Sequence, residues 1–218
     1  MTSTKDGQVF RRILLDKTGR RLVQWPVEKV EKLRTKQVNL HNKELKGGSV
    51  HEISGVTASQ ADVEISFELS NLKEAEFIHA NLVNPQVLCS QKNASAKGTI
   101  GPFGLLVLAS MDLTEQTAIS FRIFKGLEKY NVLMCSDQSR SSSREGVDKT
   151  TFGAFVDIDH SIVESFGGEG RTCMTARVYP KLAIDKEAHL YAFNNGSQSV
   201  IITSLTAWSM KKAQIAPI

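Results

Sequence analysis

The sequence predicts an all-β fold, a sandwich or a barrel of antiparallel strands. Residues 61–69 alternate strictly between apolar and polar side chains, and residues 119–123 repeat the alternation, which is typical of half-buried antiparallel strands. Turn signals recur roughly every 8–12 residues, and no strand–helix–strand alternation indicates a parallel sheet. With 41% hydrophobic and 23% charged residues among 218, the chain has the composition of an ordinary globular protein.

The first 48 residues predict a hairpin, a short helix and a linker. Residues 8–25 indicate the hairpin, with a turn at Asp16-Lys-Thr-Gly19 where glycine allows a positive φ. Pro26 begins a short helical stretch, in which apolar residues recur at helical spacing and glutamates occupy the early turns. The polar residues 35–48 end in two glycines and are interpreted as a linker.

Short strands are expected along the rest of the chain. Turn signals such as Asn84-Pro85, the glycine-rich residues 167–170 and Asn194-Asn195-Gly196 separate them. Besides the two alternating segments, the expected strands are 50–57, 103–110, 130–136, 152–158, 160–166, 171–179, 188–193 and 198–208.

The net charge of +4 is unevenly distributed: residues 1–48 hold 12 basic and 5 acidic side chains. The basic side chains are interleaved with apolar ones and form no basic–aromatic motif, so we expect a solvated basic face and no nucleic-acid partner. No apolar run approaches the ~20 residues of a membrane helix, so no membrane partner is expected. The first residues also lack the apolar stretch of a secretory signal.

Carboxylates near the middle of the chain are the candidates for catalysis. Asp157, Asp159 and Glu164 could supply the two acids of glycoside hydrolysis, although acids that point outward from strands are common. A triad through His160 and Ser161 is disfavoured, because adjacent residues of a strand point to opposite faces. The five histidines never occur at metal-ligand spacing, and residues 167–170 are too short for a phosphate loop. We therefore expect no metal, no cofactor and no catalytic residue.

Three cysteines leave two alternatives open. Cys89, Cys135 and Cys173 form no CxxC pair, so they are either buried thiols or one bridge with one thiol left over. Two sequons, Asn93-Ala-Ser95 and Asn195-Gly-Ser197, lean toward an oxidising history and hence toward the bridge.

Six segments of the sequence resemble plant acid invertases and fructan exohydrolases of glycoside hydrolase family 32. The resemblance implies a two-sheet antiparallel β-sandwich over residues 49–218, the linker at 35–48, and a remnant of the last β-propeller blade with its linker helix at 1–34. The segments are Leu22-Val-Gln-Trp-Pro-Val-Glu-Lys-Val-Glu-Lys-Leu-Arg34, Val87-Leu-Cys-Ser-Gln-Lys92, Gly101-Pro-Phe-Gly-Leu-Leu-Val-Leu-Ala109, Val132-Leu-Met-Cys-Ser-Asp-Gln-Ser-Arg140, Asp159-His-Ser-Ile-Val-Glu-Ser-Phe-Gly-Gly168 and Thr175-Ala-Arg-Val-Tyr-Pro180.

The resemblance also implies a function. In the family the catalytic acids lie on the propeller, in Trp-x-Asn-Asp-Pro-Asn, Arg-Asp-Pro and Glu-Cys motifs. Here no Asp precedes a proline and no Glu precedes a cysteine. We therefore expect the non-catalytic C-terminal part of a β-fructofuranosidase-like glycosidase, inactive alone, whose partner is the catalytic propeller and whose parent hydrolyses sucrose or fructan. The family is secreted to the cell wall or vacuole. The alternative is a free carbohydrate-binding or protein-interaction module.

The same resemblance assigns a disulfide and raises two questions about folding. It pairs Cys89 with Cys135, both in strand-like segments. The sequons themselves make Asn93 and Asn195 the expected glycosylation sites, whereas in a reducing compartment neither the bridge nor a glycan would form. In the family a segment as long as a strand follows the position of Asp159, and this chain lacks that segment, as a spliced or decayed gene product would. We therefore expect an unpaired sheet edge or a re-pairing of the neighbouring strands. The N-terminal hairpin, without its propeller partners, is expected to be mobile.

Overall fold

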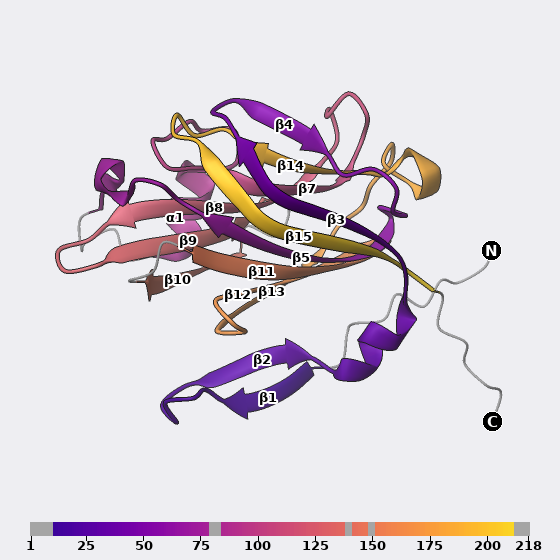
Figure 1. The fold of residues 1–218 in the computed structure, drawn as a ribbon, viewed down its shortest axis with the longest axis horizontal. Helices are drawn as coiled ribbons and strands as arrows, with labels where there is room; N and C mark the ends of the chain where they lie inside the picture. Colours follow the sequence, from indigo (N-terminus) through magenta and orange to yellow (C-terminus); the bar gives the residue numbers. More distant parts are fainter. Residues whose placement is uncertain (1–10, 79–83, 138–140, 148–150, 212–218) are drawn as a thin grey trace.

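Two mainly antiparallel sheets lie face to face in a computed structural model, which describes residues 11–78, 84–137, 141–147 and 151–211 (Figure 1). A separate two-stranded hairpin lies beside one of the sheets. The predicted all-β sandwich is confirmed. Residues 1–10 of the predicted propeller remnant and the last seven residues of the predicted sandwich lie outside the described residues.

The six-stranded sheet has the order β13-β12-β11-β5-β15-β3 within the described part of the chain. Its strands, in chain order, are β3 (Arg34–Leu45), β5 (Gln60–Glu68), β11 (Thr151–Asp159), β12 (Ile162–Gly167), β13 (Thr172–Arg177) and β15 (Val200–Met210).

The seven-stranded sheet has the order β10-β9-β8-β7-β14-β4, and β6 joins β8 in parallel. Its strands are β4 (Ser49–Glu52), β6 (Glu76–Phe77), β7 (Phe103–Ala109), β8 (Thr117–Lys125), β9 (Tyr130–Ser136), β10 (Ser141–Val147) and β14 (His189–Asn194).

The core lies between the two sheets and follows the alternation seen in the sequence. Phe67 of β5 packs edge-on against Phe103 of β7, with ring centroids 5.0 Å apart, and Phe121 of β8 completes the cluster. All three side chains are buried. Since apolar burial stabilises by roughly 25 cal/mol per Å², these inward faces provide most of the driving force for folding.

Short helices cover the ends and one outer face of the sandwich. They are η1 (Glu28–Leu33), η2 (Leu72–Glu74), α1 (Pro85–Gln91) and η3 (Asp185–Glu187). No helix of the described residues is long and apolar enough to cross a membrane.

The strand-like assignment of the segment around Cys89 is wrong, because this cysteine lies on α1. Asn84 Oδ1 accepts hydrogen bonds from the backbone N–H groups of Gln86 and Val87, and Pro85 occupies the first helical turn. An asparagine cap followed by proline is a helix start as well as a turn signal.

The predicted linker at 35–48 is also wrong over most of its length. β3 occupies Arg34–Leu45 and pairs with β15 along the edge of the six-stranded sheet. An edge strand exposes one side and one row of backbone groups to solvent, so it tolerates many polar side chains. The polar composition of such an edge strand resembles that of a linker.

The predicted N-terminal hairpin is present as β1 (Arg11–Leu15) and β2 (Leu22–Pro26), and the predicted helical stretch follows as η1. Asp16 closes the turn, since its side chain accepts hydrogen bonds from the backbone of Thr18 and Arg20.

The junction at Asp159 leaves no gap in the sheet. β11 and β12 pair directly from Asp159↔Ile162 to Ala154↔Gly167, joined by His160 and Ser161. His160 has a φ of 52°, the left-handed conformation that the first residue of a tight two-residue turn requires. Of the two outcomes expected here, the direct pairing of the neighbouring strands is the one observed.

Candidate functional site

Three carboxyl groups form a row across the outer face of the six-stranded sheet. Asp157 on β11 lies opposite Asp62 on β5 and opposite Glu164 on β12. They point away from the core, as the alternation predicts, yet their exposures are only 0% for Asp62, 5% for Asp157 and 0% for Glu164. Outward-pointing acids are common on strands, but these three are buried because another element covers this face. We call Asp62, Asp157 and Glu164 the carboxyl row.

The cover is the N-terminal hairpin together with η1. Trp25 of β2 packs against Phe155 and Phe166, with ring centroids 5.8 and 5.9 Å apart. The backbone N–H of Gln24 donates to the carbonyl of Gly170 at 2.7 Å. The expectation that the hairpin has no partners is thus corrected, because it docks on the sandwich through an aromatic cluster.

Two arginines, Arg11 from the cover and Arg34 at the start of β3, pair with the ends of the carboxyl row. Arg34 Nε donates to Asp62 Oδ2 at 2.9 Å, and its guanidinium lies 3.9 Å from the ring centroid of Trp208. Burial alone would lower the pKa of Arg34, but its bonds to Asp62 and Glu64 raise it. Arg11 of β1 donates to Glu164. The ends of the row are therefore neutralised by guanidinium groups.

The middle of the row has no such partner. Among the described residues, no ion pair to Asp157 is found. Burial, a hydrogen bond with Asp62 and the charges of Asp62, Glu164 and Asp159 raise the pKa of Asp157 to about 9. Asp157 is therefore protonated at neutral pH.

The carboxyl row has no room for a sugar. The cavity beside Asp62, lined also by Trp25, Val30 and Phe155, measures about 10 Å³, roughly the space of one water molecule. The candidate pair of Asp157 and Glu164 is therefore buried where a glycoside cannot reach it.

The other sequence candidates lie at the end of the β11–β12 hairpin. Asp159 contacts His160 Nδ1 at 2.8 Å, and both side chains are about one third exposed. Ser161 follows His160 in the turn, and its carbonyl accepts a hydrogen bond from the N–H of Val178. These contacts fix the turn.

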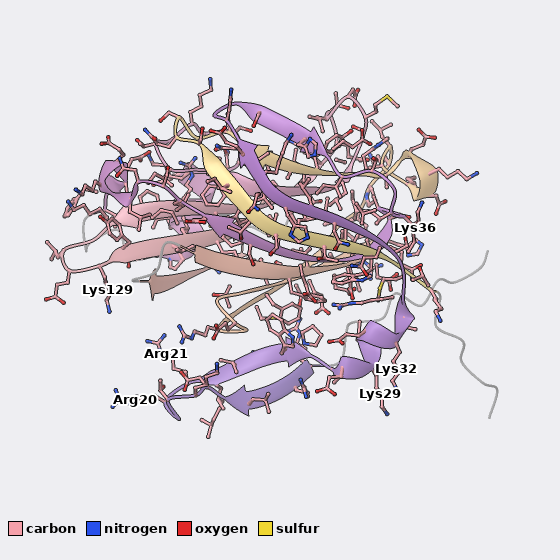
Figure 2. The ribbon with its side chains drawn as sticks, viewed as in Figure 1. Arg20, Arg21, Lys29, Lys32, Lys36 and Lys129 are labelled. Atoms are coloured by element: carbon pink, nitrogen blue, oxygen red, sulfur yellow. A yellow bond between two sulfur atoms is a disulfide. The ribbon has the colours of Figure 1, made fainter. Side chains whose placement is uncertain are left out.

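The exposed side of the hairpin and of η1 is basic. Figure 2 shows Arg20 and Arg21 at the tip of the hairpin, Lys29 and Lys32 on η1, and Lys36 at the start of β3. All five side chains are exposed. These basic side chains of the N-terminal stretch therefore lie in solvent.

A disulfide joins Cys89 on α1 to Cys135 on β9, with 5.7 Å between the Cα atoms. This is the pair that the family resemblance implied, and the separation lies within the usual range for a bridge. The two sulfurs belong to a small apolar cluster on the outer face of the seven-stranded sheet. Cys173 is a free thiol whose pKa burial raises to about 11.

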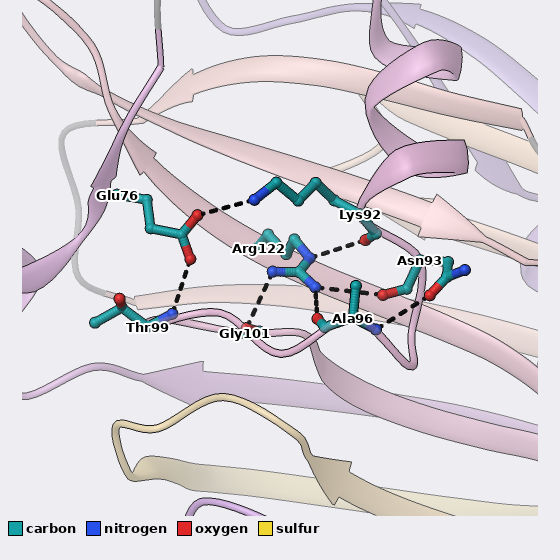
Figure 3. Close-up of polar contacts among 7 residues, drawn as sticks. All are labelled: Glu76, Lys92, Asn93, Ala96, Thr99, Gly101 and Arg122. Atoms are coloured by element: carbon teal, nitrogen blue, oxygen red, sulfur yellow. Dashed lines mark hydrogen bonds and ion pairs between the residues drawn. The ribbon is translucent and has the colours of Figure 1, made fainter.

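Arg122 on β8 is a buried residue that the sequence analysis did not single out (Figure 3). Its guanidinium donates to the carbonyls of Lys92 at 2.9 Å, Gly101 at 3.2 Å and Asn93 at 3.3 Å, and also to that of Ala96. It is 2% exposed, and burial lowers its pKa. Arg122 therefore binds the chain that follows α1 to the outer face of the sheet.

Glu76 supplies the negative charge that acts most strongly on this arginine. It pairs with Lys92 at 3.3 Å and accepts a hydrogen bond from the N–H of Thr99 at 2.9 Å (Figure 3). Burial acts to raise the pKa of Glu76, but the bond from Thr99 and the charge of Lys92 outweigh it and lower the pKa.

Residues 29–209 match the family model described as "Glycosyl hydrolases family 32 C terminal". The chain belongs to this family. It is 57% identical to "Beta-fructofuranosidase, insoluble isoenzyme CWINV1" of Arabidopsis thaliana, over 94% of this chain and 38% of that protein. It is also 57% identical to "Fructan 6-exohydrolase" of Beta vulgaris, over 94% of this chain and 36% of that protein.

The fold of this family 32 domain matches a solved structure as well. The crystal structure of fructan 1-exohydrolase IIa from Cichorium intybus superposes with a TM-score of 0.88 at 51% identity, over 94% of this chain and 41% of that one. The chain thus spans well under half the length of these relatives, in which the C-terminal domain is attached to further, N-terminal sequence.

The two sequons of this family 32 domain lie on neighbouring loops. Asn93 is exposed, and its Oδ1 accepts from the N–H groups of Ser95 and Ala96. Asn195 is half-buried, and its Nδ2 donates to the carbonyls of Ala94 at 3.1 Å and Ser95 at 3.2 Å. The amide nitrogen to which a glycan would be attached is thus engaged in hydrogen bonds at Asn195.

Proposed function

We propose that this chain acts as the non-catalytic C-terminal sandwich of a β-fructofuranosidase-like hydrolase and packs against the catalytic N-terminal domain. The supporting observation is an uncovered apolar surface on the hairpin. Ile13, Leu14, Leu15 and Leu22 expose 64%, 47%, 65% and 68% of their surfaces. Clustered apolar exposure of this kind marks an interaction surface.

The open end of the hairpin contacts the sandwich through Trp25 and Arg11, whereas the apolar residues nearer its turn stay exposed, which suits it to join two domains. Within the described residues β1 and β2 pair as strands only with each other, and β2 also donates from Gln24 to Gly170, so the outer edge of β1 is the one left to accept a further strand. We propose that the N-terminal domain covers the apolar residues and extends this small sheet.

In this proposal the chain supports hydrolysis of sucrose or fructan but does not perform it. It lacks the family's Asp-Pro and Glu-Cys motifs, and its own buried carboxyl pair is closed to a sugar. Its role is to stabilise the catalytic domain and to form one wall of the cleft that leads to the active site.

The test combines the purified chain with the separately expressed N-terminal domain of the Arabidopsis relative. We expect no release of fructose from sucrose or 1-kestose by the chain alone, and a complex with the N-terminal domain on size-exclusion chromatography. Leu22→Asp should abolish the complex, whereas Leu127→Asp, at an 85% exposed position of the β8–β9 turn, should not. Turnover by the chain alone, or equal complexes with both variants, would contradict the proposal.

We also propose that the chain follows the secretory route and that its sequons are glycosylation sites. Asn93 is the better acceptor, because its side-chain nitrogen is not required by the contacts described above. A glycan on Asn195 would have to displace the hydrogen bonds that join this loop to residues 94 and 95.

A further inference from the structure

The carboxyl row holds more acidic groups than cations. Arg34 pairs with Asp62 and Arg11 pairs with Glu164, which leaves Asp157 between them without a cation among the described residues. Asp62 Oδ2 accepts from Arg34, but Asp62 Oδ1 is buried and accepts no hydrogen bond from any nitrogen or hydroxyl of that part of the chain. A second carboxyl group, that of Asp157, is in hydrogen-bonding contact with Asp62.

We infer that Asp62 and Asp157 share a single proton in the folded protein, and that this proton is what allows the hairpin and η1 to close over the carboxyl row. Asp157 donates the O–H, and the unpaired Oδ1 of Asp62 accepts it. The arrangement goes beyond the proposed function and does not depend on it.

Geometry makes the proton necessary. An ionised Asp157 beside Asp62 would need water or a cation of its own, and the nearby Arg34 is already bound to Asp62. The cavity here accommodates about one water, and its walls include Trp25, Val30 and Phe155. A carboxyl–carboxylate hydrogen bond is charge-assisted and removes the need for solvent. Loss of the proton would favour entry of water, which requires the cover to lift.

The other titratable groups around the pair do not replace this proton. Arg34 and Arg11 are bound to the two ends of the row, and Asp159 and Glu164 add further negative charge. The remaining ionisable groups near the row are Glu31 of η1, Glu64 of β5 and Cys173 of β13. None of these three can neutralise Asp157, because two are acids and the third is a thiol.

The sign of the pH dependence follows from linkage. The folded pKa of Asp157, about 9, lies above the unfolded value near 3.8. The folded state therefore binds more protons between these values, and this contribution to stability is complete in acid and is lost as the pH rises through that window. The cover should be tightest in acid and loosen toward alkaline pH.

The decisive experiment compares the full chain with Asp157→Asn, which keeps a hydrogen-bond donor for Asp62 but cannot ionise. Urea unfolding is measured at intervals from pH 5 to pH 8. Relative to the variant, the folding equilibrium constant of the wild type should fall by up to about tenfold per pH unit. The matched control is Glu68→Gln, an exposed acid on the same strand as Asp62, which should follow the wild type. Parallel profiles for wild type and Asp157→Asn would overturn the inference.

Two direct measurements cover the case in which Asp157→Asn does not fold. The carboxyl ¹³C shift of Asp157 in the wild type should be that of a protonated acid at pH 6, and an ionised carboxylate there would overturn the inference. Acrylamide quenching should then report on the cover: in the wild type Trp25 should become more accessible between pH 6 and pH 9. If Trp25 stays equally accessible while Asp157 ionises, the shared proton does not control closure of the hairpin. That result would refute the claim that the proton allows the cover to close.

Discussion

The outer faces of the two sheets are both covered by a short local element, but the two covers are attached by different means. On the seven-stranded sheet, α1 is held by the Cys89–Cys135 bridge, and the chain after it is held by four backbone carbonyls that accept from Arg122. On the six-stranded sheet, the hairpin is held by Trp25 and by the ion pair of Arg11 with the buried Glu164.

The difference shows how one sandwich combines a permanent cover with a conditional one. A disulfide and an arginine bound to carbonyls do not titrate near neutrality, so these two attachments on the α1 side are insensitive to pH there. The hairpin side depends on charges and on one proton, and its strands also expose apolar side chains outward. The cover on the α1 side stabilises the domain. The hairpin cover presents the surface that we propose contacts the N-terminal domain.

Removal of the disulfide should have the largest effect on this comparison. Replacing both Cys89 and Cys135 with alanine removes the cross-link between two positions 46 residues apart in the sequence. The chain-entropy estimate gives a loss of about 4 kcal/mol in the free energy of unfolding. Urea denaturation measures it. Cys173→Ala is the matched control and should change stability by less than about 1 kcal/mol, because this thiol is unbridged. An equal loss in the control would show that packing, and not the cross-link, is responsible.

Replacement of Arg122 should have the next largest effect. Arg122→Met fills similar space but leaves the four carbonyls without their donor, so we expect a loss of about 3 kcal/mol, since each buried unsatisfied group costs roughly 1–3 kcal/mol before relaxation. Arg122→Lys should recover part of it. Trp25 fluorescence should not change in either variant, and a change would mean that the two covers are coupled.

Disruption of the hairpin should have the smallest effect on global stability. Trp25→Ala removes the contacts with Phe155 and Phe166 and should cost about 1–2 kcal/mol, mostly as local opening. Amide exchange should rise across residues 11–26 and stay unchanged across 61–69. In the wild type the hairpin should already be less protected than the sandwich strands. Equal protection in both regions would contradict a conditional cover.

Sequence patterning predicted the fold where one face of a strand meets the core. The alternation of Val63, Ile65 and Phe67 identified β5 and the side that it buries. It failed for β3, because an edge strand needs few apolar side chains, and for α1, because Asn84-Pro85 serves both turns and helix starts.

The same alternation could not predict what covers the opposite face. It placed Asp62 and Arg122 on outward sides, which is correct, but burial there depends on elements far away in the chain. The Cys89–Cys135 pair was implied by the family resemblance alone, since spacing left both cysteine alternatives open. The arginines that complete each site could be found only from the contacts that tertiary structure creates.

The absence of a flexible joint between the hairpin and the sandwich, within the described residues, has a mechanical consequence. η1 ends at Leu33, β3 begins at Arg34, and the carbonyl of Leu33 accepts from the N–H of Lys211 at 2.9 Å. Thr35 also donates to the carbonyl of Ser209 at 2.8 Å. No flexible segment of the described chain can therefore absorb a displacement of the hairpin. The displacement is transmitted to the hydrogen bonds between β3 and β15, so a force on the hairpin strains the edge of the sheet.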